Sequence, residues 1–300
     1  MRYIGMNGSI VEAADAFIPV MDHGLLYGMG LFETFRTYQG KPYLIERHLH
    51  RLMDNCGILG IPYHADPLRI SRWISELMEA NGLQDAYIRY TVTAGEGILG
   101  LPAGDYAKPS EILFAKELPA ANPALYGNGR ALRRLSLPRN TPESPVRMKS
   151  LHYMNNILAK RELSGYASRS DEPEEGLMLT AAGEVAEGIV SNVFFVKAGR
   201  LFTPELGIGI LPGITRSVVL ELAMDLGIEA EEGRYSWDVL TEADEIFTTG
   251  SVQEIVPITT LIGTEGQTLR IGQGIAGPLT RLLLSAYRRK AGLGHENNDL

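Results

Sequence analysis

Lys149 is a residue that could do covalent chemistry, and it lies in the stretch RMKSLHYMNNILAKREL at residues 147–163. Apolar residues recur there at helical spacing: Leu151, Met154, Ile157, Leu158 and Leu163. Ser150 is a plausible N-cap for this helix, so Lys149 would face the positive end of the macrodipole, where a cation is disfavoured. This position would lower the pKa of Lys149, and only a neutral amine attacks a carbonyl carbon. A solvated surface lysine is the alternative.

Glu187 is the second candidate, in the sequence GEVAEGIVSNVFF. A strand through this segment would place Glu187 on the same, largely apolar face as Val185 and Val193. A carboxylate buried there needs a cationic or hydrogen-bonding partner. The protonated ring nitrogen of pyridoxal phosphate is one such partner, because this pairing makes the cofactor an electron sink. A glutamate at a strand end, or at a bulge near Gly188, is the alternative.

Two turns could bind an anion. In GILPGITRSVVLELA, a proline–glycine turn leads into a strong helix, which leaves the amides of Ile214 and Thr215 unpaired at its N-terminus. In TTGSVQE (248–254), Ser251 lies in a second turn after a predicted strand and could donate to the same anion. Both turns are therefore candidates for a phosphate site, and an ordinary helix cap at Thr215 is the alternative.

Two other patterns resemble known sites but fail on their context. GEGILG at residues 95–100 matches the glycine spacing of a dinucleotide-binding loop, but that loop must open a helix, and here Leu101 and Pro102 follow. His48 and His50 are two residues apart on a predicted helix and point to different sides, which excludes a shared metal ion. No Cys/His pairing exists elsewhere, so the sequence predicts no metal site.

The composition is typical of a globular protein in water, with 45% hydrophobic and 21% charged residues among 300. The net charge of −8 argues against non-specific nucleic-acid binding, so the cations for an anionic substrate must be gathered locally. Cys56 is the only cysteine, which excludes an internal disulfide, and its helical spacing predicts core packing. No signal peptide and no apolar run of about 18 residues is evident, which predicts a cytoplasmic protein without a membrane span.

The elements that must position these residues are of mixed type. Before residue 118 the patterns predict hairpins at Asn7-Gly8 and Gln39-Gly40, helices over 46–59 and 67–81, and strands at 86–94 and in EILFAK. The segment ELPAANPALYGNG collects breakers and indicates a boundary. We therefore expect an α/β (α+β) fold with an N-terminal domain at 1–118, a linker at 119–129 and a C-terminal domain at 130–300 that carries Lys149.

Five passages occur in order over nearly the whole chain: DHGLLYGMGLFETFR, MKSLHYMNNILAKRE, EVAEGIVSN, LPGITR and TGSVQEIVP. Together they resemble the class IV aminotransferase family, the fold-type-IV pyridoxal-phosphate enzymes. The resemblance implies the two-domain fold of D-amino-acid and branched-chain aminotransferases. It also implies pyridoxal 5′-phosphate as the cofactor and a homodimer as the assembly.

The resemblance assigns roles to single residues. Lys149 would form the Schiff base with the cofactor, and Glu187 would pair with the pyridine nitrogen. Arg51 would bind the phosphate, although the helical pattern alone places it on a solvated polar face. The other implied cofactor contacts are backbone or hydroxyl groups of Ile214, Thr215 and Ser251, and the side chain of Tyr153 near the phenolic oxygen.

The passages around Met29 and Lys149 most resemble the aminodeoxychorismate lyases of this family. These enzymes release pyruvate from 4-amino-4-deoxychorismate and leave 4-aminobenzoate for folate biosynthesis. Met29 is a departure, because many lyases and D-amino-acid enzymes have an acidic residue there. The implied substrate is a small dianion, so arginine is expected in its site. The candidates for substrate binding are Arg89, Tyr27, Arg36 and Arg147, with a structural ion pair for Arg89 and a core position for Tyr27 as alternatives.

Two other functions stay open at this stage. A transaminase acting on D- or branched-chain amino acids has the same fold, cofactor and lysine. A binding module that carries the cofactor without catalysis is the second alternative. The presence of both Lys149 and Glu187 argues against it, because a module without activity has no need of the pair.

Overall fold

A computed structural model describes residues 1–120, 122–166 and 174–293 of the chain. The chain divides into two compact units. The N-terminal unit comprises Met1–Ala120 and Met148–His152, and the C-terminal unit comprises Ala121–Arg147 and Tyr153–Leu300. The short segment with Lys149 therefore packs with the N-terminal unit, although most of the chain around it belongs to the C-terminal unit.

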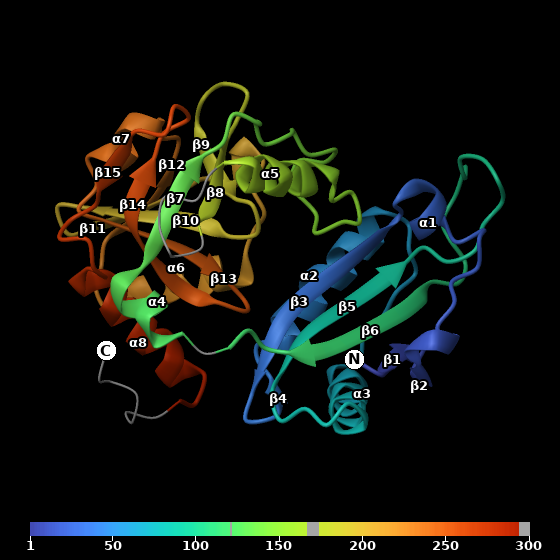
Figure 1. Cartoon of the computed structure of the whole chain (residues 1–300). Coiled ribbons are helices and arrows are strands. Elements are labelled where there is room, and N and C mark those ends of the chain that lie inside the picture. Colours follow the sequence, from blue (N-terminus) through green and yellow to red (C-terminus); the bar gives the residue numbers. More distant parts are fainter. Residues whose placement is uncertain (121, 167–173, 294–300) are drawn as a thin grey trace. The chain divides into compact units, whose positions relative to one another are not determined.

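The N-terminal unit is built on an antiparallel sheet with the strand order β2-β1-β6-β5-β3-β4. Its strands are β1 (Tyr3–Met6), β2 (Ser9–Glu12), β3 (Gly30–Tyr38), β4 (Lys41–Pro42), β5 (Ala86–Thr93) and β6 (Ser110–Glu117). Its α-helices are α1 (His23–Tyr27), α2 (Ile45–Ile58) and α3 (Pro67–Ala80). In Figure 1 the strands β3, β5 and β6 run side by side, and α2 follows β3 along the sheet.

Alternation along the strands gives this sheet two different faces. Leu31 and Phe35 of β3 lie in one core with apolar residues of α2 and α3, because successive strand residues point to opposite sides. Cys56 of α2 is fully buried in the same core, which confirms its predicted packing role. Phe32, Arg89 and Thr91 lie at alternate positions and therefore face the other side of the sheet.

The predicted turns of this unit are confirmed. Asn7 and Gly8 join β1 to β2 with φ of 48° and 81°, and Gln39 and Gly40 join β3 to β4 with φ of 52° and 74°. Positive φ at both central residues gives a turn whose twist matches that of the flanking strands, and asparagine and glycine adopt it at low cost. The expected helices also form, as α2 and α3, within one or two residues of the predicted ends.

The C-terminal unit contains a mixed sheet with the order β12-β11-β10-β13-β14-β7-β8-β9, and β15 pairs with β14. Its strands are β7 (Arg130–Arg134), β8 (Glu175–Leu179), β9 (Val185–Gly188), β10 (Asn192–Lys197), β11 (Arg200–Pro204), β12 (Ala230–Gly233), β13 (Glu245–Gly250), β14 (Glu254–Ile262) and β15 (Thr268–Arg270). Its α-helices are α4 (Pro123–Asn128), α5 (Met154–Gly165), α6 (Ile214–Asp225), α7 (Trp237–Thr241) and α8 (Pro278–Lys290). Helix α4 lies within the stretch that the sequence presents as a linker. The helices α6 and α8 pack against β13 of this sheet.

The segment around Lys149 is not the helix start that its sequence predicts. Helix α5 begins at Met154, and residues 149–151 are extended beside β3. The N–H of Phe32 donates to the carbonyl of Lys149 at 2.9 Å, and the N–H of Leu151 donates to the carbonyl of Gly30 at 3.0 Å. These bonds pair the backbone groups of Lys149 and Leu151 with β3. The same groups could not make them if a helix began at Ser150. The prediction of a helix N-terminus next to Lys149 is therefore wrong.

The predicted apolar face of that helix is confirmed only at Leu163 and is wrong at three other positions. Met154, Ile157 and Leu158 are exposed, whereas Asn156, Ala159 and Leu163 are buried. Asn156 is buried because its side-chain amide donates to the carbonyl of Ile189 at 2.5 Å. The buried side of α5 is therefore determined in part by the hydrogen bond of a polar residue, and not by the spacing of apolar residues alone.

Of two further expectations, one differs from the structure and the other is confirmed. The strand through Glu187 ends at Gly188 and resumes at Asn192, because the N–H of Gly188 closes a turn onto the carbonyl of Ser191 at 2.7 Å. The expected absence of a helix after residues 95–100 is confirmed, since this segment is a loop. Within residues 1–120, 122–166 and 174–293, no helix is long and apolar enough to cross a membrane.

Candidate active site

Lys149 lies beside a buried aromatic ring on the open face of the N-terminal sheet. Its Nζ is 4.7 Å from the centroid of Phe32, and Phe32 is only 2% exposed. The guanidinium carbon of Arg89 is 3.7 Å from the same centroid. The N-terminal unit therefore brings two of the predicted residues to one ring, which attracts both cations through its electron-rich face.

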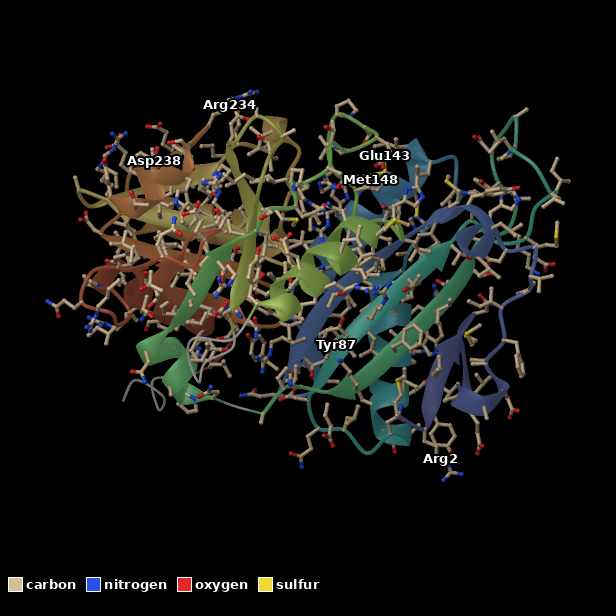
Figure 2. All side chains as sticks on the ribbon, turned by 45° about the horizontal axis from the view of Figure 1, so that its top comes forward. Arg2, Tyr87, Glu143, Met148, Arg234 and Asp238 are labelled. Carbon is tan, nitrogen blue, oxygen red and sulfur yellow. The ribbon has the colours of Figure 1, made fainter. Side chains whose placement is uncertain are left out.

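A cavity of about 620 Å³ opens on this face of the sheet. Arg89 and Thr91 of β5 line it, together with Leu151, which is two residues from Lys149. Tyr87, labelled in Figure 2, is the next residue of β5 on the same face. The remaining lining residues are Met1, Ile18, Gly24, Leu25, Ile112, Phe114 and Lys116. A mainly apolar hollow with two basic side chains is suited to a small anion that carries a ring or an alkyl group.

Tyr27 ends α1 and is half-buried. Its hydroxyl accepts the N–H of Gly100 at 2.8 Å, so it ties α1 to the loop after β5. Gly28 follows with φ of 67°, and a Cβ there would lie 2.4 Å from the ring of His152. Only glycine combines this left-handed conformation with so close an approach. Gly28 is therefore required for His152 to lie this close to Tyr27.

Arg51 forms a buried cluster with Glu33 and His48. The Nε and Nη2 of Arg51 donate to the two carboxylate oxygens of Glu33 at 2.8 and 2.6 Å, and the Nδ1 of His48 is 2.6 Å from the second oxygen. Only 11% of the Arg51 side chain is exposed, so its predicted position on a solvated face is wrong. The reason is Glu33, which comes from β3 and turns this polar side of α2 inward.

The charged groups of this cluster shift each other's pKa values. Burial alone would raise the pKa of Glu33, but the Arg51 guanidinium and the bond to His48 outweigh it and bring the pKa down to about 2. Burial lowers the pKa of His48, and the nearby charges of Arg51 and Lys149 lower it further against the pull of Glu33. At neutral pH the cluster is thus a carboxylate, a guanidinium and a neutral imidazole.

Glu187 is buried as the sequence predicts, with 4% of its surface exposed. Its Oε1 accepts the Nε–H of Arg139 at 2.7 Å, and its Oε2 accepts the N–H of Leu211 at 2.9 Å. The side-chain amide of Asn192 lies farther from Oε2, at 3.4 Å. The carboxylate therefore has the cationic partner that a buried charge requires, and that partner was not predicted.

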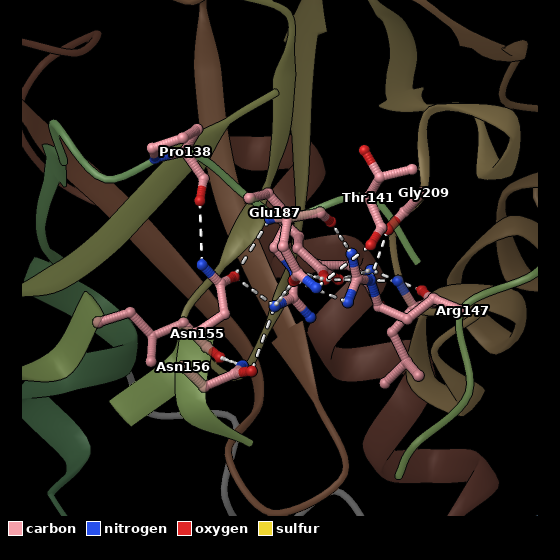
Figure 3. A network of polar contacts seen from close by, with 12 residues as sticks. Pro138, Thr141, Arg147, Asn155, Asn156, Glu187 and Gly209 are labelled. Carbon is pink, nitrogen blue, oxygen red and sulfur yellow. Dashed lines mark hydrogen bonds and ion pairs between the residues drawn. The ribbon is translucent and has the colours of Figure 1, made fainter. Parts of the chain in front are cut away.

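Arg139 could not be found from the sequence pattern, because it lies in the proline-rich segment between β7 and Lys149. It bonds to Glu187 and to Asn155 and Asn156 of α5, and Figure 3 shows these three side chains close together in one polar network. Arg147, a predicted substrate residue, lies in the same network, with its Nε 3.8 Å from the Oε1 of Glu187. Its Nε donates to the carbonyl of Gly209 at 2.5 Å, so the protein itself provides an acceptor for this guanidinium.

The start of α6 has the form of an anion site. Gly213 is the N-cap and no side chain caps the helix, so the amides of Ile214 and Thr215 lie at an N-terminus without a side-chain acceptor. The hydroxyls of Thr215 and Ser251 are 3.4 Å apart. The C-terminal unit thus brings together three residues that the sequence assigns to one phosphate.

The two remaining candidates lie in less distinctive positions. Tyr153 is half-buried at the N-cap of α5, and its carbonyl accepts the N–H of Ile157 at 3.0 Å. Arg36 is half-buried at the far part of β3, where its guanidinium carbon lies 4.3 Å from the ring centroid of Tyr38. In the part of the chain that the structure describes, no three His, Cys, Asp or Glu side chains are arranged to hold a metal ion.

The sequence model of the amino-transferase class IV family matches residues 30–261, a range that contains β3, the lysine segment, β9 and the start of α6. The chain belongs to this family. The family assignment made from the five sequence passages is therefore confirmed. The expected mixed α/β fold is also confirmed, and it is the fold of class IV enzymes with solved structures.

Members of the family with different names are similar to this chain in sequence. It is 42% identical over 258 residues to the aminodeoxychorismate lyase of Bacillus subtilis, covering 85% of each chain. It is 38% identical over 275 residues to a putative branched-chain-amino-acid aminotransferase of Methanocaldococcus jannaschii, covering 90% of this chain and 91% of that one.

Solved structures of the family also carry both names. The 4-amino-4-deoxychorismate lyase of Pseudomonas aeruginosa superimposes with a TM-score of 0.81 at 30% identity, over 95% of this chain and 98% of that chain. A branched-chain amino acid aminotransferase complexed with N-(5′-phosphopyridoxyl)-L-glutamate superimposes with a TM-score of 0.80 at 31% identity, over 98% of this chain and 95% of that chain. The fold is therefore common to enzymes with both names and does not by itself separate them.

Proposed function

We propose that this class IV enzyme is a 4-amino-4-deoxychorismate lyase, which eliminates pyruvate and leaves 4-aminobenzoate for folate biosynthesis. The observation that carries the proposal is the 42% identity to a named lyase over 85% of both chains. The cofactor is pyridoxal 5′-phosphate, which supplies a conjugated electron sink when it is bound. All other roles in the reaction belong to side chains and backbone groups of this protein.

Three features of the C-terminal unit fit this cofactor. The uncapped start of α6 and the paired hydroxyls of Thr215 and Ser251 suit a phosphate. Next to Gly250, the buried hydroxyl of Thr249 has no hydrogen-bond partner among the described residues. The buried carboxylate of Glu187 suits a protonated ring nitrogen. We assign phosphate binding to Ile214, Thr215 and Ser251, and the ring nitrogen to Glu187.

In the N-terminal unit, Lys149 and Arg51 take the roles that the family pattern gives them. Lys149 attaches the cofactor through Nζ, and Arg51 contributes its positive charge to phosphate binding. The bidentate bond to Glu33 fixes the plane of the Arg51 guanidinium, so little side-chain entropy remains to be lost when an anion binds. Tyr153 is assigned to the phenolic oxygen of the cofactor.

The cavity beside Phe32 suits the substrate. Arg89 and Lys116 supply positive charge for a dianion, while Phe114 and Leu151 supply apolar surface for a six-membered ring. Arg89 is the first candidate for a carboxylate, and Tyr27 holds the neighbouring loop through Gly100. Arg36 and Arg147 are weaker candidates, because neither of them lines this cavity.

The reaction needs one proton to be moved and one bond to break. Once the substrate's amino group has replaced Lys149 on the cofactor, the freed Nζ of Lys149 would remove the proton from the ring carbon that carries the amino group. The electrons of that C–H bond expel the enolpyruvyl oxygen, so the C–O bond to the ring breaks and the ring becomes aromatic. The leaving group takes up a proton and is released as pyruvate, which balances the reaction without water or an oxidant.

A transaminase is the second candidate. The 38% identity to a putative branched-chain aminotransferase favours it, and the same Lys149, Glu187 and phosphate groups would serve. The difference would lie in where the proton goes after Lys149 has removed it. A transaminase returns it to the cofactor carbon, whereas the lyase lets a β-substituent leave.

The deciding experiment uses purified protein reconstituted with pyridoxal phosphate. Enzymatically generated 4-amino-4-deoxychorismate is added, and pyruvate and 4-aminobenzoate are measured together. In parallel, D-alanine and L-leucine are supplied with 2-oxoglutarate and glutamate is measured. The proposal predicts equal amounts of pyruvate and 4-aminobenzoate, with little glutamate. Glutamate formation without an aromatic product would overturn it in favour of the transaminase.

We also propose that the enzyme is a cytoplasmic homodimer. A chain with one cysteine has no internal disulfide, which fits a reducing compartment. Phe17, Val20 and Leu25 of the N-terminal unit are exposed by 76%, 74% and 64%, an amount of apolar surface that a second subunit could cover. Light scattering should give twice the chain mass of 32.9 kDa, and a monomer at micromolar concentration would contradict the dimer.

A further inference from the structure

The carboxylate of Glu187 depends on one guanidinium. Arg139 donates Nε–H to its Oε1 at 2.7 Å, and the side chains of both residues are less than 10% exposed. The other short bond comes from the backbone N–H of Leu211 to Oε2. The side-chain amide of Asn192 makes a third, longer bond to Oε2, at 3.4 Å. A carboxylate has about four lone-pair positions, so these three bonds leave it able to accept one further donor.

Arg139 is itself held in place from several directions. Its Nη1 donates to the side-chain carbonyl of Asn155 at 2.7 Å and to that of Asn156 at 3.2 Å, both in the first turn of α5. The amide of Asn155 in turn donates to the carbonyl of Pro138 at 3.0 Å. Figure 3 shows the side chain of Asn155 reaching Pro138 on one side, with Asn156 and Glu187 nearby. The orientation of Arg139 is thus determined by α5 and by its own segment, independently of Glu187.

A second guanidinium, that of Arg147, strengthens the same field. Burial, followed by the charge of Arg139, lowers the pKa of Arg147 to about 10, so it still carries its charge at neutral pH. Its contacts are with the carbonyl of Gly209 and with Asn140, and its Nε stays 3.8 Å from Glu187. Arg147 therefore adds charge to the surroundings of Glu187, whereas Arg139 makes the direct bond.

We propose that Arg139 is a positioning residue that acts through Glu187, holding its carboxylate in the orientation that a protonated ring nitrogen requires. The inference rests on the proposed role of Glu187 in cofactor binding. Without Arg139, the buried carboxylate of Glu187 would lose its shortest charge-assisted bond and would no longer be held in one orientation. The cofactor would then lose both affinity and its ability to accept electrons.

The test compares Arg139→Gln and Arg139→Lys with a matched control. Arg133 is an equally buried arginine of the C-terminal unit, and its Nε donates to Glu174 at 2.6 Å. Arg133→Gln therefore removes a similar buried ion pair at a different carboxylate. For each apoprotein the affinity for pyridoxal phosphate, the visible spectrum of the bound cofactor between pH 5 and 9, and the melting temperature are measured.

The expected result is a loss of cofactor affinity by about tenfold or more in Arg139→Gln, the size of one charge-assisted hydrogen bond. The pH midpoint of the cofactor spectrum should shift in this variant, and Arg139→Lys should recover most of both properties. Arg133→Gln should lower the melting temperature but leave affinity and spectrum unchanged. A common loss of stability in both Gln variants, with cofactor affinity and spectrum as in the wild type, would overturn the inference.

The proposed function fails separately from this inference. If the unaltered apoprotein does not bind pyridoxal phosphate, the proposed function itself is wrong. If the unaltered protein binds it and Glu187→Gln weakens that binding while Arg139→Gln does not, Glu187 keeps its role and only the positioning role of Arg139 is contradicted.

Discussion

Glu33 in the N-terminal unit and Glu187 in the C-terminal unit are both buried carboxylates bonded to arginine, but their bonds differ. Glu33 accepts two bonds from Arg51 and is 2.6 Å from the Nδ1 of His48. Glu187 accepts one bond from Arg139, one from the backbone of Leu211 and a longer one, of 3.4 Å, from the side-chain amide of Asn192. All three bonds to Glu33 come from basic side chains and are 2.8 Å or shorter, whereas only one of the three bonds to Glu187 comes from a basic side chain.

This difference separates two uses of a buried charge. Glu33 fixes the orientation of Arg51, and its own role is then structural, because breaking a buried pair leaves an uncompensated charge. Glu187 is fixed by its neighbours so that it can serve a partner outside the protein chain. The same pair of residue types is therefore an anchor in one unit and a candidate ligand site in the other.

Glu187→Gln should have the largest effect on catalysis. The amide keeps the shape of the side chain but removes the charge that holds the ring nitrogen protonated, so we expect kcat to fall on the order of 100-fold. Steady-state turnover at saturating pyridoxal phosphate measures this. Glu174→Gln is the control, because it neutralises another buried carboxylate of the same unit that is paired with Arg133. Equal losses in both variants would contradict a specific role of Glu187 in cofactor binding.

Glu33→Gln should act mainly on stability. The pKa of Glu33 is lowered from 4.5 to about 2, so its charge stabilises the fold above pH 4.5, and this stabilisation is lost as the pH falls towards 2. The shift corresponds to about 3 kcal/mol of unfolding free energy. Urea unfolding between pH 7 and pH 3 should show this decline in the wild type and a weaker decline in the variant.

His48 changes the same profile in the same direction. Burial, together with the Arg51 and Lys149 charges, lowers the pKa of His48 below 6.5, so the unfolded state binds more protons and stability falls as the pH drops below 6.5. His48→Gln should remove the upper part of the decline. A wild type whose stability rises between pH 6.5 and pH 3 would contradict the charge states assigned to this cluster.

Tyr27→Phe should have a smaller effect, limited to substrate binding. It removes the acceptor for the N–H of Gly100 and so loosens the loop after β5, while the ring packing on His23 stays. Losing one neutral hydrogen bond should raise KM about fivefold and leave kcat unchanged. A fall in kcat with an unchanged KM would instead give Tyr27 a part in the chemical step.

Arg36→Gln should have the smallest effect of these substitutions. Its guanidinium already stacks on Tyr38, away from the cavity that Arg89 lines, so we expect kcat/KM to change by less than about threefold. Initial rates at low substrate concentration measure this ratio. A larger loss, comparable with that in an Arg89→Gln variant, would move substrate binding towards the far part of β3.

Local patterns allowed much of the fold to be predicted. Asn7-Gly8 fixed its hairpin because two neighbouring residues determine the turn, and the 3.6-residue spacing in α2 and α3 was strong enough to place both helices. The parallel pairing of β7 with β14 could not be predicted in this way. It joins strands from distant parts of the sequence, and no local pattern in either strand predicts which strand it pairs with.

The candidate site shows the same limit. The apolar alternation around Glu187 was sufficient to predict its burial, but its partner Arg139 lies in an irregular segment 48 residues away in the chain. Arg51 looked solvated because its ion-pair partner Glu33 comes from a strand and not from its own helix. Lys149 was identified, yet the helix dipole expected beside it was wrong, because backbone pairing with β3 outweighed the local helical pattern.

The most direct test of the proposed chemistry is to find which lysine carries the cofactor. Borohydride reduces the C=N bond between a lysine and pyridoxal phosphate to a stable amine, and peptide mass spectrometry then locates the phosphopyridoxyl group. We predict one group per chain, on Lys149, and no label or turnover in Lys149→Ala. A label on another lysine, such as Lys116 or Lys160, or full turnover in Lys149→Ala, would contradict this assignment.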